Sequence, residues 1–541
     1  MITLLTLTRD GLKEKQQWEK AGIRLPRYDA AQTARKTEQA PRWVHFGAGN
    51  IFRGFIAGLQ QRLLNAGLCD TGILAAETYD HEIIDKIYDP HDSLSILVLM
   101  RPDGTLDKEV VASIAKGLRA DRTSEEDWEA LKKIFVSPTL QMVSFTITEK
   151  GYSLRNMSGE LLPAARADME NGPAAPKHAM AVVASLAYDR FRAGELPVAF
   201  VSMDNCSHNG EKLSRSVLEI ARAWEKNGFV PAAFVEYLQN PEKVSFPWSM
   251  IDKITPRPSE FVQKALEKDG LSGMAPVVTA KKTFIAPFVN AEVPQYLVVE
   301  DRFPNGRPPL EKAGVYFADR ETVEKTERMK VTTCLNPLHT ALAVYGCLLG
   351  YESIAAEMKD DELKKLVEKI GYQEGMPVVV NPGILNPEDF IHEVVDQRLP
   401  NPFIPDTPQR IATDTSQKIP VRFGETIKSY RSRPDLDPSS LRYIPLALAG
   451  WCRYLLGVDD EGNPMAVSAD PMLGELQEKL SGVTVGDSGS YRGQLRPILS
   501  NPVLFGVNLY DAGLGERVES YFRELIAGKH AVRATLKKYL D

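Results

Sequence analysis

Apolar residues in the first three hundred positions form short continuous runs, separated by segments with helical spacing. The run WVHF enters a glycine turn, and the next segment, IFRGFIAGLQQRLLNAG, places its apolar residues on one helical face. Three further runs follow in GILAAE, LQMVSFTIT and PVAFVSM, and amphipathic segments precede the last two. Continuous apolar runs are typical of strands buried on both faces, so the pattern predicts an α/β fold with a parallel sheet.

The pattern changes after about residue 305, at the Pro- and Gly-rich segment RFPNGRPPLEKAG. Beyond it the chain contains amphipathic segments such as TALAVYGCLLGY, DELKKLVEKIG and SYFRELIAGKHAVRATLKKYL. We therefore expect an N-terminal extension over residues 1–40, an α/β domain over 41–305 and a mostly α-helical domain over 306–541.

Composition and net charge limit the kinds of molecule that the protein is expected to bind. A chain of 541 residues with 43% hydrophobic and 25% charged residues is typical of a globular protein of several domains. Its net charge of -7 disfavours a nucleic-acid binder, which needs a basic surface, and favours a small-molecule partner. No apolar run approaches the length of a membrane span, and MITLLTL lacks the features of a signal peptide. Five scattered cysteines without metal-ligand spacing indicate reduced thiols in a cytoplasmic protein. We expect a monomer or a small homo-oligomer.

The turn HFGAGNIFRG has the setting of a dinucleotide-binding site, because a strand enters G-x-G and a helix follows. Phe52 occupies the place of the third glycine. Glu77 ends the second strand, where it would bond an adenosine ribose and repel a 2′-phosphate, which favours NAD over NADP. A purely structural glycine turn and a methyltransferase remain alternatives. The cofactor-binding candidates here are Gly47, Gly49, Asn50, Ile51, Phe52, Arg53 and Glu77.

Seven segments occur in the same order as in one family, the long-chain polyol and sugar-acid dehydrogenases that include mannitol dehydrogenase. They are HFGAGNIFRGFIAG, SFTITEKGY, MDNCSHNG, FPWSMIDKITP, VVEDRFPNGRPPLEKAGV, ERMKVTTCLNPLHTALAVYG and RIATDTSQKIPVRF. The chain thus resembles this family over most of residues 41 to about 430. The resemblance implies a Rossmann-like N-terminal domain, a helical C-terminal domain, and metal-independent hydride transfer between a nicotinamide and a secondary alcohol or ketone.

The resemblance also implies residue roles. Reduction of a ketone builds negative charge on oxygen, so the site needs a proton donor and amide donors near that oxygen. Lys330 matches the family's catalytic lysine, while Asn205 and Asn336 match its asparagines and His339 its histidine. We expect Glu327 to relay the proton and His339 to orient substrate hydroxyls. The substrate-binding candidates are Arg410, Lys418, Asn401 and Asp204, and further cofactor contacts are expected from Thr146, Thr148 and Glu149.

Structural alternatives remain for these residues. His339 can be a buried core histidine, Asn336 a helix cap before Pro337, and Arg410 and Lys418 solvated loop charges. Lys330 and Asn336 are six residues apart, whereas the mannitol dehydrogenases have five. One added residue turns a helix by about 100°, so we expect VTTC to form a bulge or a break between two helical pieces.

The run KVTTCLNPLHT resembles the fructuronate reductase branch, whose substrate carries a carboxylate. We expect Arg410 to bind that carboxylate, because an arginine can do so through two parallel hydrogen bonds. The expected activity is NAD-dependent interconversion of D-fructuronate and D-mannonate. Tagaturonate/altronate and mannitol/fructose are the alternatives within the family. Outside it, an epimerase with bound NAD and a non-catalytic nucleotide-binding module remain open.

Overall fold

The computed structural model describes residues 5–156 and 158–541. The chain forms two compact units, Met1–Glu324 and Lys325–Asp541. In unit 1, β15 (Tyr316–Ala318) pairs in parallel with β14 (Tyr296–Glu300), so the chain just beyond residue 305 still contributes a strand to this unit. The three expected domain ranges stay a prediction.

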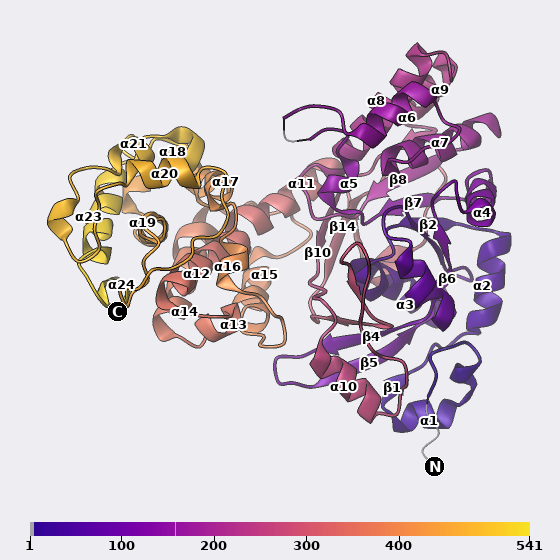
Figure 1. Ribbon diagram of the computed structural model, residues 1–541, viewed down its shortest axis with the longest axis horizontal. Helices are drawn as coiled ribbons and strands as arrows, with labels where there is room; N and C mark the ends of the chain where they lie inside the picture. Colours follow the sequence, from indigo (N-terminus) through magenta and orange to yellow (C-terminus); the bar gives the residue numbers. More distant parts are fainter. Residues whose placement is uncertain (1–4, 157) are drawn as a thin grey trace. The chain divides into compact units, whose positions relative to one another are not determined.

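Unit 1 contains a six-stranded parallel sheet (Figure 1). Its order is β6 (Ile114–Arg119), β3 (Ile73–Glu77), β2 (Trp43–Phe46), β7 (Met142–Phe145), β8 (Val198–Ser202) and β9 (Val244–Ser245). The strand order reverses between β2 and β7, because the chain proceeds outward from β2 through β3 and then from β7 through β8. In such sheets ligands bind outside the carboxyl ends of the strands at the reversal point.

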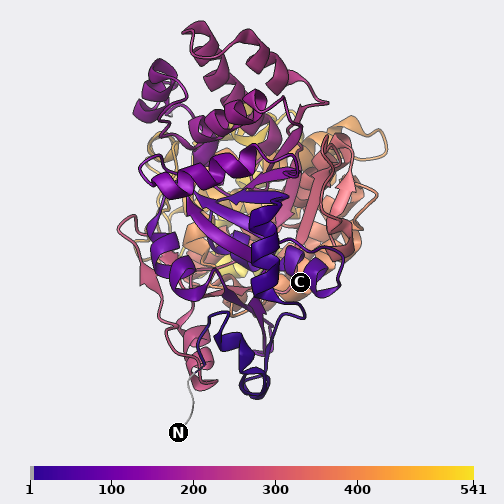
Figure 2. The same cartoon turned by 90° about the vertical axis from the view of Figure 1, so that its right-hand side faces the viewer.

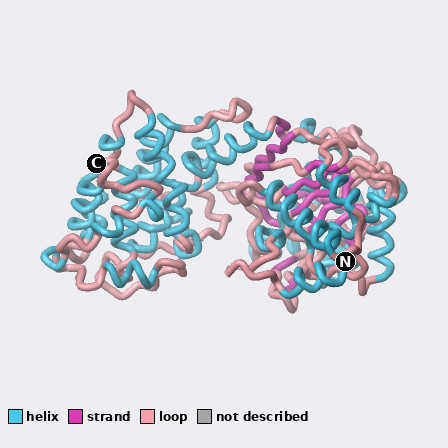
Figure 3. Tube along the Cα trace, turned by 90° about the horizontal axis from the view of Figure 1, so that it is seen from above, coloured by secondary structure: helices cyan, strands magenta, loops and turns pink. Residues whose placement is uncertain are grey.

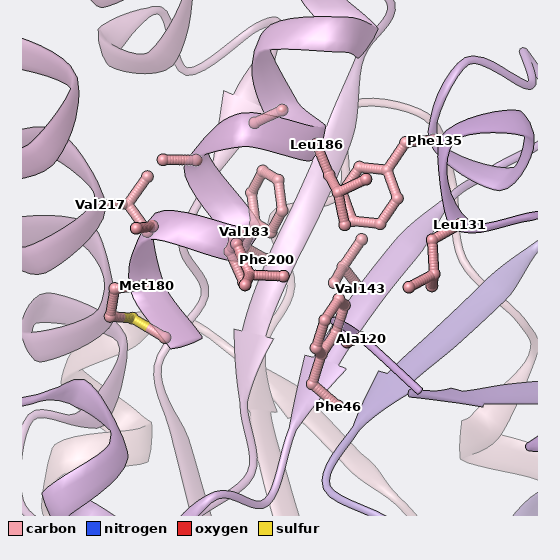
Figure 4. Close-up of a cluster of buried hydrophobic side chains, with 14 of the residues drawn as sticks. Phe46, Ala120, Leu131, Phe135, Val143, Met180, Val183, Leu186, Phe200 and Val217 are labelled. Atoms are coloured by element: carbon pink, nitrogen blue, oxygen red, sulfur yellow. The ribbon is translucent and has the colours of Figure 1, made fainter. Parts of the chain in front are cut away.

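Both faces of this sheet are buried, which explains the continuous apolar runs. One face packs on α4 (Glu125–Phe135), α7 (Ala179–Arg192) and α8 (Asn209–Lys226). Figure 4 shows Phe46, Val143 and Phe200 of the strands gathered with side chains of these helices. The opposite face packs on a π-helical turn, Phe52–Ile56, and α3 (Ala57–Asn65).

The remaining strands of unit 1 form smaller sheets. They are β1 (Ile23–Arg24), β5 (Leu106–Val111), β4 (Ser95–Met100) and β13 (Phe288–Ala291) in one sheet, β10 (Ser249–Asp252) with β14 and β15 in another, and the hairpin β11 (Val277–Val278) and β12 (Phe284–Ile285). The N-terminal segment joins them through the β1–β5 pairing. Two views place α1 (Lys15–Lys20) and α10 (Glu260–Lys268) at the same end of the unit (Figure 1, Figure 2).

Other helices of unit 1 connect these strands. They are α2 (Ala30–Gln39), α5 (Thr148–Tyr152), α6 (Pro163–Asn171) and α9 (Ala232–Gln239). The prediction of an α/β domain with a parallel sheet, followed by helices, is confirmed. Figure 3 shows every described strand in unit 1 and helices throughout unit 2.

Unit 2 is built around two long apolar helices, α12 (Asn336–Leu349) and α19 (Tyr443–Tyr454). The others are α11 (Arg320–Met329), which enters the unit, α13 (Ile354–Glu357), α14 (Asp361–Glu368), α15 (Pro387–Glu393), α16 (Pro408–Ile411), α17 (Thr415–Ile419), α18 (Glu425–Ser432), α20 (Leu473–Lys479), α21 (Arg496–Leu499), α22 (Pro502–Phe505), α23 (Gly515–Leu525) and α24 (Ala531–Leu540). Among the described residues, no helix has the length and apolarity needed to cross a bilayer.

A glycine sets how closely α12 and α19 approach. A Cβ added at Gly450 would lie 2.6 Å from the ring of Tyr345. That tyrosine is fully buried and donates a hydrogen bond from its hydroxyl to the carbonyl of Leu446, 2.8 Å away. The ring therefore has little freedom to move away from a larger side chain.

Gly450→Ala should destabilise the protein by about 1–3 kcal/mol, because the added methyl overpacks a rigid contact. Gly474→Ala is the matched control, since a Cβ on this α20 glycine meets no atom within 4 Å. It should leave stability unchanged or raise it by up to about 1 kcal/mol through helix propensity. Urea unfolding measures both, and equal losses would contradict the packing argument.

Candidate functional site

The glycine turn after β2 lies at the reversal point of the sheet, where Thr146 follows the neighbouring strand β7. Gly47 has φ +104°, and a Cβ there would lie 2.2 Å from the carbonyl oxygen of Thr146. A Cβ at Gly49 would meet nothing within 4 Å. Gly47 thus permits the close approach of two strand ends, while Gly49 leaves open space at the start of a helix, where backbone N–H groups favour a phosphate.

The carboxylate of Glu77 is buried and bonded to backbone. It accepts hydrogen bonds from the N–H groups of Ala48 (2.8 Å), Tyr79 (2.8 Å) and Asp80 (3.2 Å). Glu77 therefore ties the end of β3 to the glycine turn. Its expected contact with a ribose stays a prediction.

The other candidates of this turn differ in exposure. Asn50 and Ile51 are half-buried, whereas Phe52 is buried and stacks on His45 with ring centroids 4.1 Å apart. Arg53 is also buried and donates to the carbonyl of Ala286 at 2.7 Å and to Oδ1 of Asn50 at 2.9 Å. Burial lowers the pKa of Arg53 to about 10. Its guanidinium therefore stabilises the glycine turn from the buried side.

Gly54 supplies the close packing expected of a third glycine, which the sequence motif did not locate. A Cβ there would lie 2.6 Å from Cγ1 of Val289 on β13. The helix after the turn therefore packs directly on a strand, two residues later than in the usual G-x-G-x-x-G spacing.

Asp204 joins the ends of β7 and β8. Its carboxylate accepts from the N–H groups of Ile147 and Thr148, both at 2.9 Å, and from the hydroxyl of Tyr152 at 2.6 Å. Burial raises the pKa of Asp204, and these hydrogen bonds oppose the shift. The residue fixes the chain beside Asn205, which is exposed. Its substrate contact stays a prediction.

The flanking residues lie on the same strand ends. Thr146 is buried, and its hydroxyl lies 2.8 Å from Nε2 of His45. Thr148 is exposed with φ +65°, and the exposed Glu149 pairs with Lys212. The sequence did not single out Asn209, which is fully buried and bonds Asp204 O and Ser249 through its side-chain amide.

In unit 2 the six-residue step from Lys330 to Asn336 is accommodated by a π-helical turn, Lys330–Cys334. The N–H of Leu335 bonds the carbonyl of Lys330, five residues back, at 3.1 Å. The step thus combines a bulge with a break, because Leu335 (φ −131°, ψ −61°) leaves helical geometry before α12 begins. Lys330 is buried, with 2% of its surface exposed. Such turns occur frequently at functional sites.

The helix α12 begins directly after the bulge. Leu335 occupies its cap position without a side-chain cap, so the interpretation of Asn336 as a helix cap is wrong. Asn336 is instead the first helical residue, because the bulge carries the chain one residue further before helical geometry resumes. Its side-chain amide bonds no other residue in the described parts of the chain. Asn336, His339 and Thr340 lie at i, i+3 and i+4, on one face of the helix.

His339 is paired with an aspartate that the sequence did not single out. Its Nε2 lies 3.0 Å from Oδ2 of Asp406, and its side chain is 16% exposed. Burial lowers the pKa of His339, while Asp406 acts in the opposite direction. Burial alone would raise the pKa of Asp406, but His339 and Arg410 outweigh it, and the pKa lies below its usual value. Asp406 therefore lies directly beside the imidazole, while Nε2 makes no hydrogen bond of good geometry within the described residues.

The predicted basic residues have contacts within the unit. Arg410 donates from Nε to Oδ1 of Asp406 at 3.0 Å, with a second bond from Nη2. Lys418 donates to the carbonyls of Ile411 (3.2 Å) and Thr413. Burial and the nearby charge of Arg422 lower the pKa of Lys418.

Two further candidate residues of unit 2 are Asn401 and Glu327. Asn401 is buried, and its side-chain oxygen accepts from the N–H of Phe403 at 3.0 Å. Glu327 is half-buried on α11, one turn before Lys330. Unit 2 thus brings His339, Asp406 and Arg410 together, with electrostatic links to Lys418 and Arg422. The roles of all the candidate residues stay predictions.

The sequence contains a partial indication of Asp406, which was not among the predicted site residues. Asp406 and Arg410 are four positions apart, the spacing of a helical ion pair. Nothing in the sequence linked Asp406 to His339, because the two are far apart in the chain and meet only through the packing of α12 on α16.

Two protein-family models match the chain. The mannitol dehydrogenase Rossmann domain matches residues 41–312, and the mannitol dehydrogenase C-terminal domain matches residues 322–512. D-mannonate oxidoreductase of Thermotoga maritima is 56% identical over 536 residues, which cover 99% of both chains.

Solved structures with this architecture include two dehydrogenases. D-sorbitol dehydrogenase in substrate-free form matches with a TM-score of 0.78 and 26% identity, over 95% of this chain and 98% of that one. The ternary complex of Pseudomonas fluorescens mannitol 2-dehydrogenase with NAD and D-mannitol matches with a TM-score of 0.70 and 26% identity, over 99% of both.

The two glycines of the turn should respond differently to alanine. Gly47→Ala should cost about 1–3 kcal/mol of stability, since it strains a positive φ and clashes with Thr146. Gly49→Ala should leave urea unfolding unchanged but weaken binding of NADH at least tenfold, because its methyl would occupy the open space. Fluorescence titration measures the binding. Wild-type affinity in Gly49→Ala would show that the dinucleotide does not approach this residue.

Asp406 gives a pH-dependent prediction. Its depressed pKa means that the carboxylate stabilises the fold above its unfolded pKa of about 3.9, and that this contribution is lost as the pH falls through the folded value. Asp406→Asn should therefore be about 1–3 kcal/mol less stable than wild type at pH 7, with the difference shrinking toward pH 3. Asp389→Asn, at an exposed position of α15, is the control and should match wild type throughout.

Proposed function

Since this chain belongs to the mannitol dehydrogenase family, we propose that it is an NAD-dependent oxidoreductase that interconverts D-fructuronate and D-mannonate. Family membership makes it a sugar-acid or polyol dehydrogenase. The observation that carries the finer proposal is the 56% identity, over nearly the whole of both chains, with a D-mannonate oxidoreductase. The basic residues around His339 agree with an anionic substrate.

The residues of unit 1 fit a nicotinamide dinucleotide. The open space at Gly49 and the helix that follows it suit a pyrophosphate, and the glycine turn lies at the reversal point of the sheet. Glu77 lies at the end of β3, where its negative charge disfavours a 2′-phosphate and so favours NAD. When bound, NAD supplies the acceptor and donor of the hydride.

Lys330 is the proposed general acid and base. Its burial on the π-helical turn keeps bulk water from the ammonium group, so that a proton on Nζ is held for the substrate oxygen. Asn336 donates from its side-chain amide to the same oxygen, and Asn205 is the proposed second amide donor. These dipoles stabilise the negative charge that develops during ketone reduction.

His339 orients a substrate hydroxyl in this proposal. Asp406 lies at its Nε2 and favours the proton on that nitrogen, so Nδ1 of the neutral imidazole accepts a hydrogen bond from the substrate hydroxyl. In the oxidative direction Lys330 must be neutral before it accepts a proton, and half-buried Glu327, one turn away on α11, relays that proton to water.

The neighbouring activities remain as alternatives. Tagaturonate and altronate differ from the proposed pair by stereochemistry, and mannitol and fructose lack the carboxylate. Family membership argues against a non-catalytic nucleotide-binding module. An epimerase with bound NAD would produce no net change in NADH.

A substrate panel tests the proposal. The protein should oxidise NADH with D-fructuronate faster than with D-tagaturonate or D-fructose, and NADH should be preferred to NADPH. Turnover of the neutral ketose alone would contradict the proposed substrate, and turnover of substrate without NADH consumption would favour the epimerase.

Lys330→Ala should lower kcat for D-fructuronate by about 10²–10⁴-fold, because proton transfer loses its positioned group. Binding of NADH should stay at the wild-type value. Lys428→Ala, on the exposed surface of α18, is the control and should keep wild-type kcat. Retained turnover in Lys330→Ala would contradict the lysine mechanism.

A further inference from the structure

Arg410 and Arg422 lie near His339, Lys418 lies near both arginines, and the structure balances the three charges unequally. Arg410 makes two hydrogen bonds to the carboxylate of Asp406. Lys418 is held by two backbone carbonyls, and the carboxylates of Asp414 and Asp470 act on it electrostatically. Arg422 differs from both, since in the described parts of the chain it makes one hydrogen bond, to a neutral hydroxyl.

That hydrogen bond positions the arginine. Nη1 of Arg422 donates to Oγ1 of Thr340 at 2.5 Å, and the same hydroxyl donates to the carbonyl of Asn336 at 2.9 Å. Thr340 directly follows His339 in α12. The guanidinium is therefore held against the turn of α12 that carries Asn336 and His339. Both of these residues have roles in the proposed function.

The remaining donors of Arg422 are available. Nε and Nη2 have no hydrogen-bond partner among the described residues, and neither atom is among those fully enclosed by the protein. These two N–H groups form the edge of the guanidinium that binds a carboxylate through two parallel hydrogen bonds. The geometry of this edge suits a ligand carboxylate.

The charge of Arg422 is costly to the unliganded fold. The residue is half-buried, and burial lowers its pKa to about 10, with no carboxylate to offset the shift. Its positive charge also lowers the pKa of Lys418 and His339. A half-buried cation that repels its neighbours favours occupation by an anion.

We propose that Arg422 binds the carboxylate of the sugar acid and so distinguishes hexuronates from neutral ketoses. The inference rests on the proposed function. It assigns the carboxylate to Arg422, whose Nε and Nη2 are available, and not to Arg410, for which the sequence predicted this role. Arg410 instead holds Asp406, and Asp406 holds His339. Each basic residue then has a distinct partner.

The test compares one charged and one neutral substrate. Arg422→Met keeps most of the side-chain length but removes the donors, and should raise KM for D-fructuronate about 100-fold. Activity with D-fructose, measured at high concentration, should be unchanged or improved. Arg422→Lys keeps the charge without the two-pronged edge and should fall between Arg422→Met and wild type.

Arg431→Met is the matched control, since Arg431 is an exposed arginine on α18. It should keep wild-type KM for both substrates. An equal loss for D-fructuronate and D-fructose in Arg422→Met would overturn the proposal, because a structural role affects both. Unchanged KM for D-fructuronate would overturn it as well.

Thermal unfolding provides an independent readout. Arg422→Met should have a Tm equal to or above that of wild type, since it removes an unbalanced cation. D-mannonate should raise the Tm of wild type and of Arg431→Met but not of Arg422→Met. A lowered Tm without ligand, together with a preserved shift by D-mannonate, would assign Arg422 a structural role.

The two proposals fail in different ways. If wild type turns over D-fructuronate and Arg422→Met does so equally well, the role of Arg422 falls and the proposed function stands. If wild type turns over another hexuronate and Arg422→Met loses it selectively, the substrate epimer is wrong and the role of Arg422 stands. If wild type acts on neutral substrates alone, both are overturned.

Discussion

The added residue between Lys330 and Asn336 is the constraint around which unit 2 is arranged. An α-helix continued through it would turn every later side chain by about 100°. The π-helical turn Lys330–Cys334 accommodates the residue, and helical geometry is interrupted at Leu335 before α12 begins. As a result Lys330 is buried on the turn, while Asn336, His339 and Thr340 share one face of α12. Pro337 is tolerated because it lies in the first turn of the new helix.

A comparable constraint acts at the glycine turn of unit 1. Two parallel strands end side by side there, and the approach of Gly47 to Thr146 leaves no room for a Cβ. Glu77 and Asp204 then hold the neighbouring loops through backbone N–H groups. Both acids lie where ligand contacts were expected, and both accept hydrogen bonds from backbone N–H groups at the ends of the strands.

Charge balance separates residues that look alike in sequence. Arg410, Lys418 and Arg422 lie within one short basic segment, yet each has a different partner. Asp406 binds Arg410 and His339 at once, so its carboxylate is shared between an arginine and an imidazole. The unbalanced charge that remains belongs to Arg422, where it is available for a ligand anion.

The sequence by itself determined the fold class, because continuous apolar runs and helical periodicity report local burial and do not depend on distant partners. It also located the glycine turn and the unusual spacing before Asn336, since both are properties of consecutive residues. The tertiary structure decided that this spacing forms a π-helical turn, that Gly54 takes the packing role of the third glycine, and which basic residue is left without a counter-ion. Those outcomes depend on contacts between residues far apart in the chain, as between His339 and Asp406, and no local pattern encodes them.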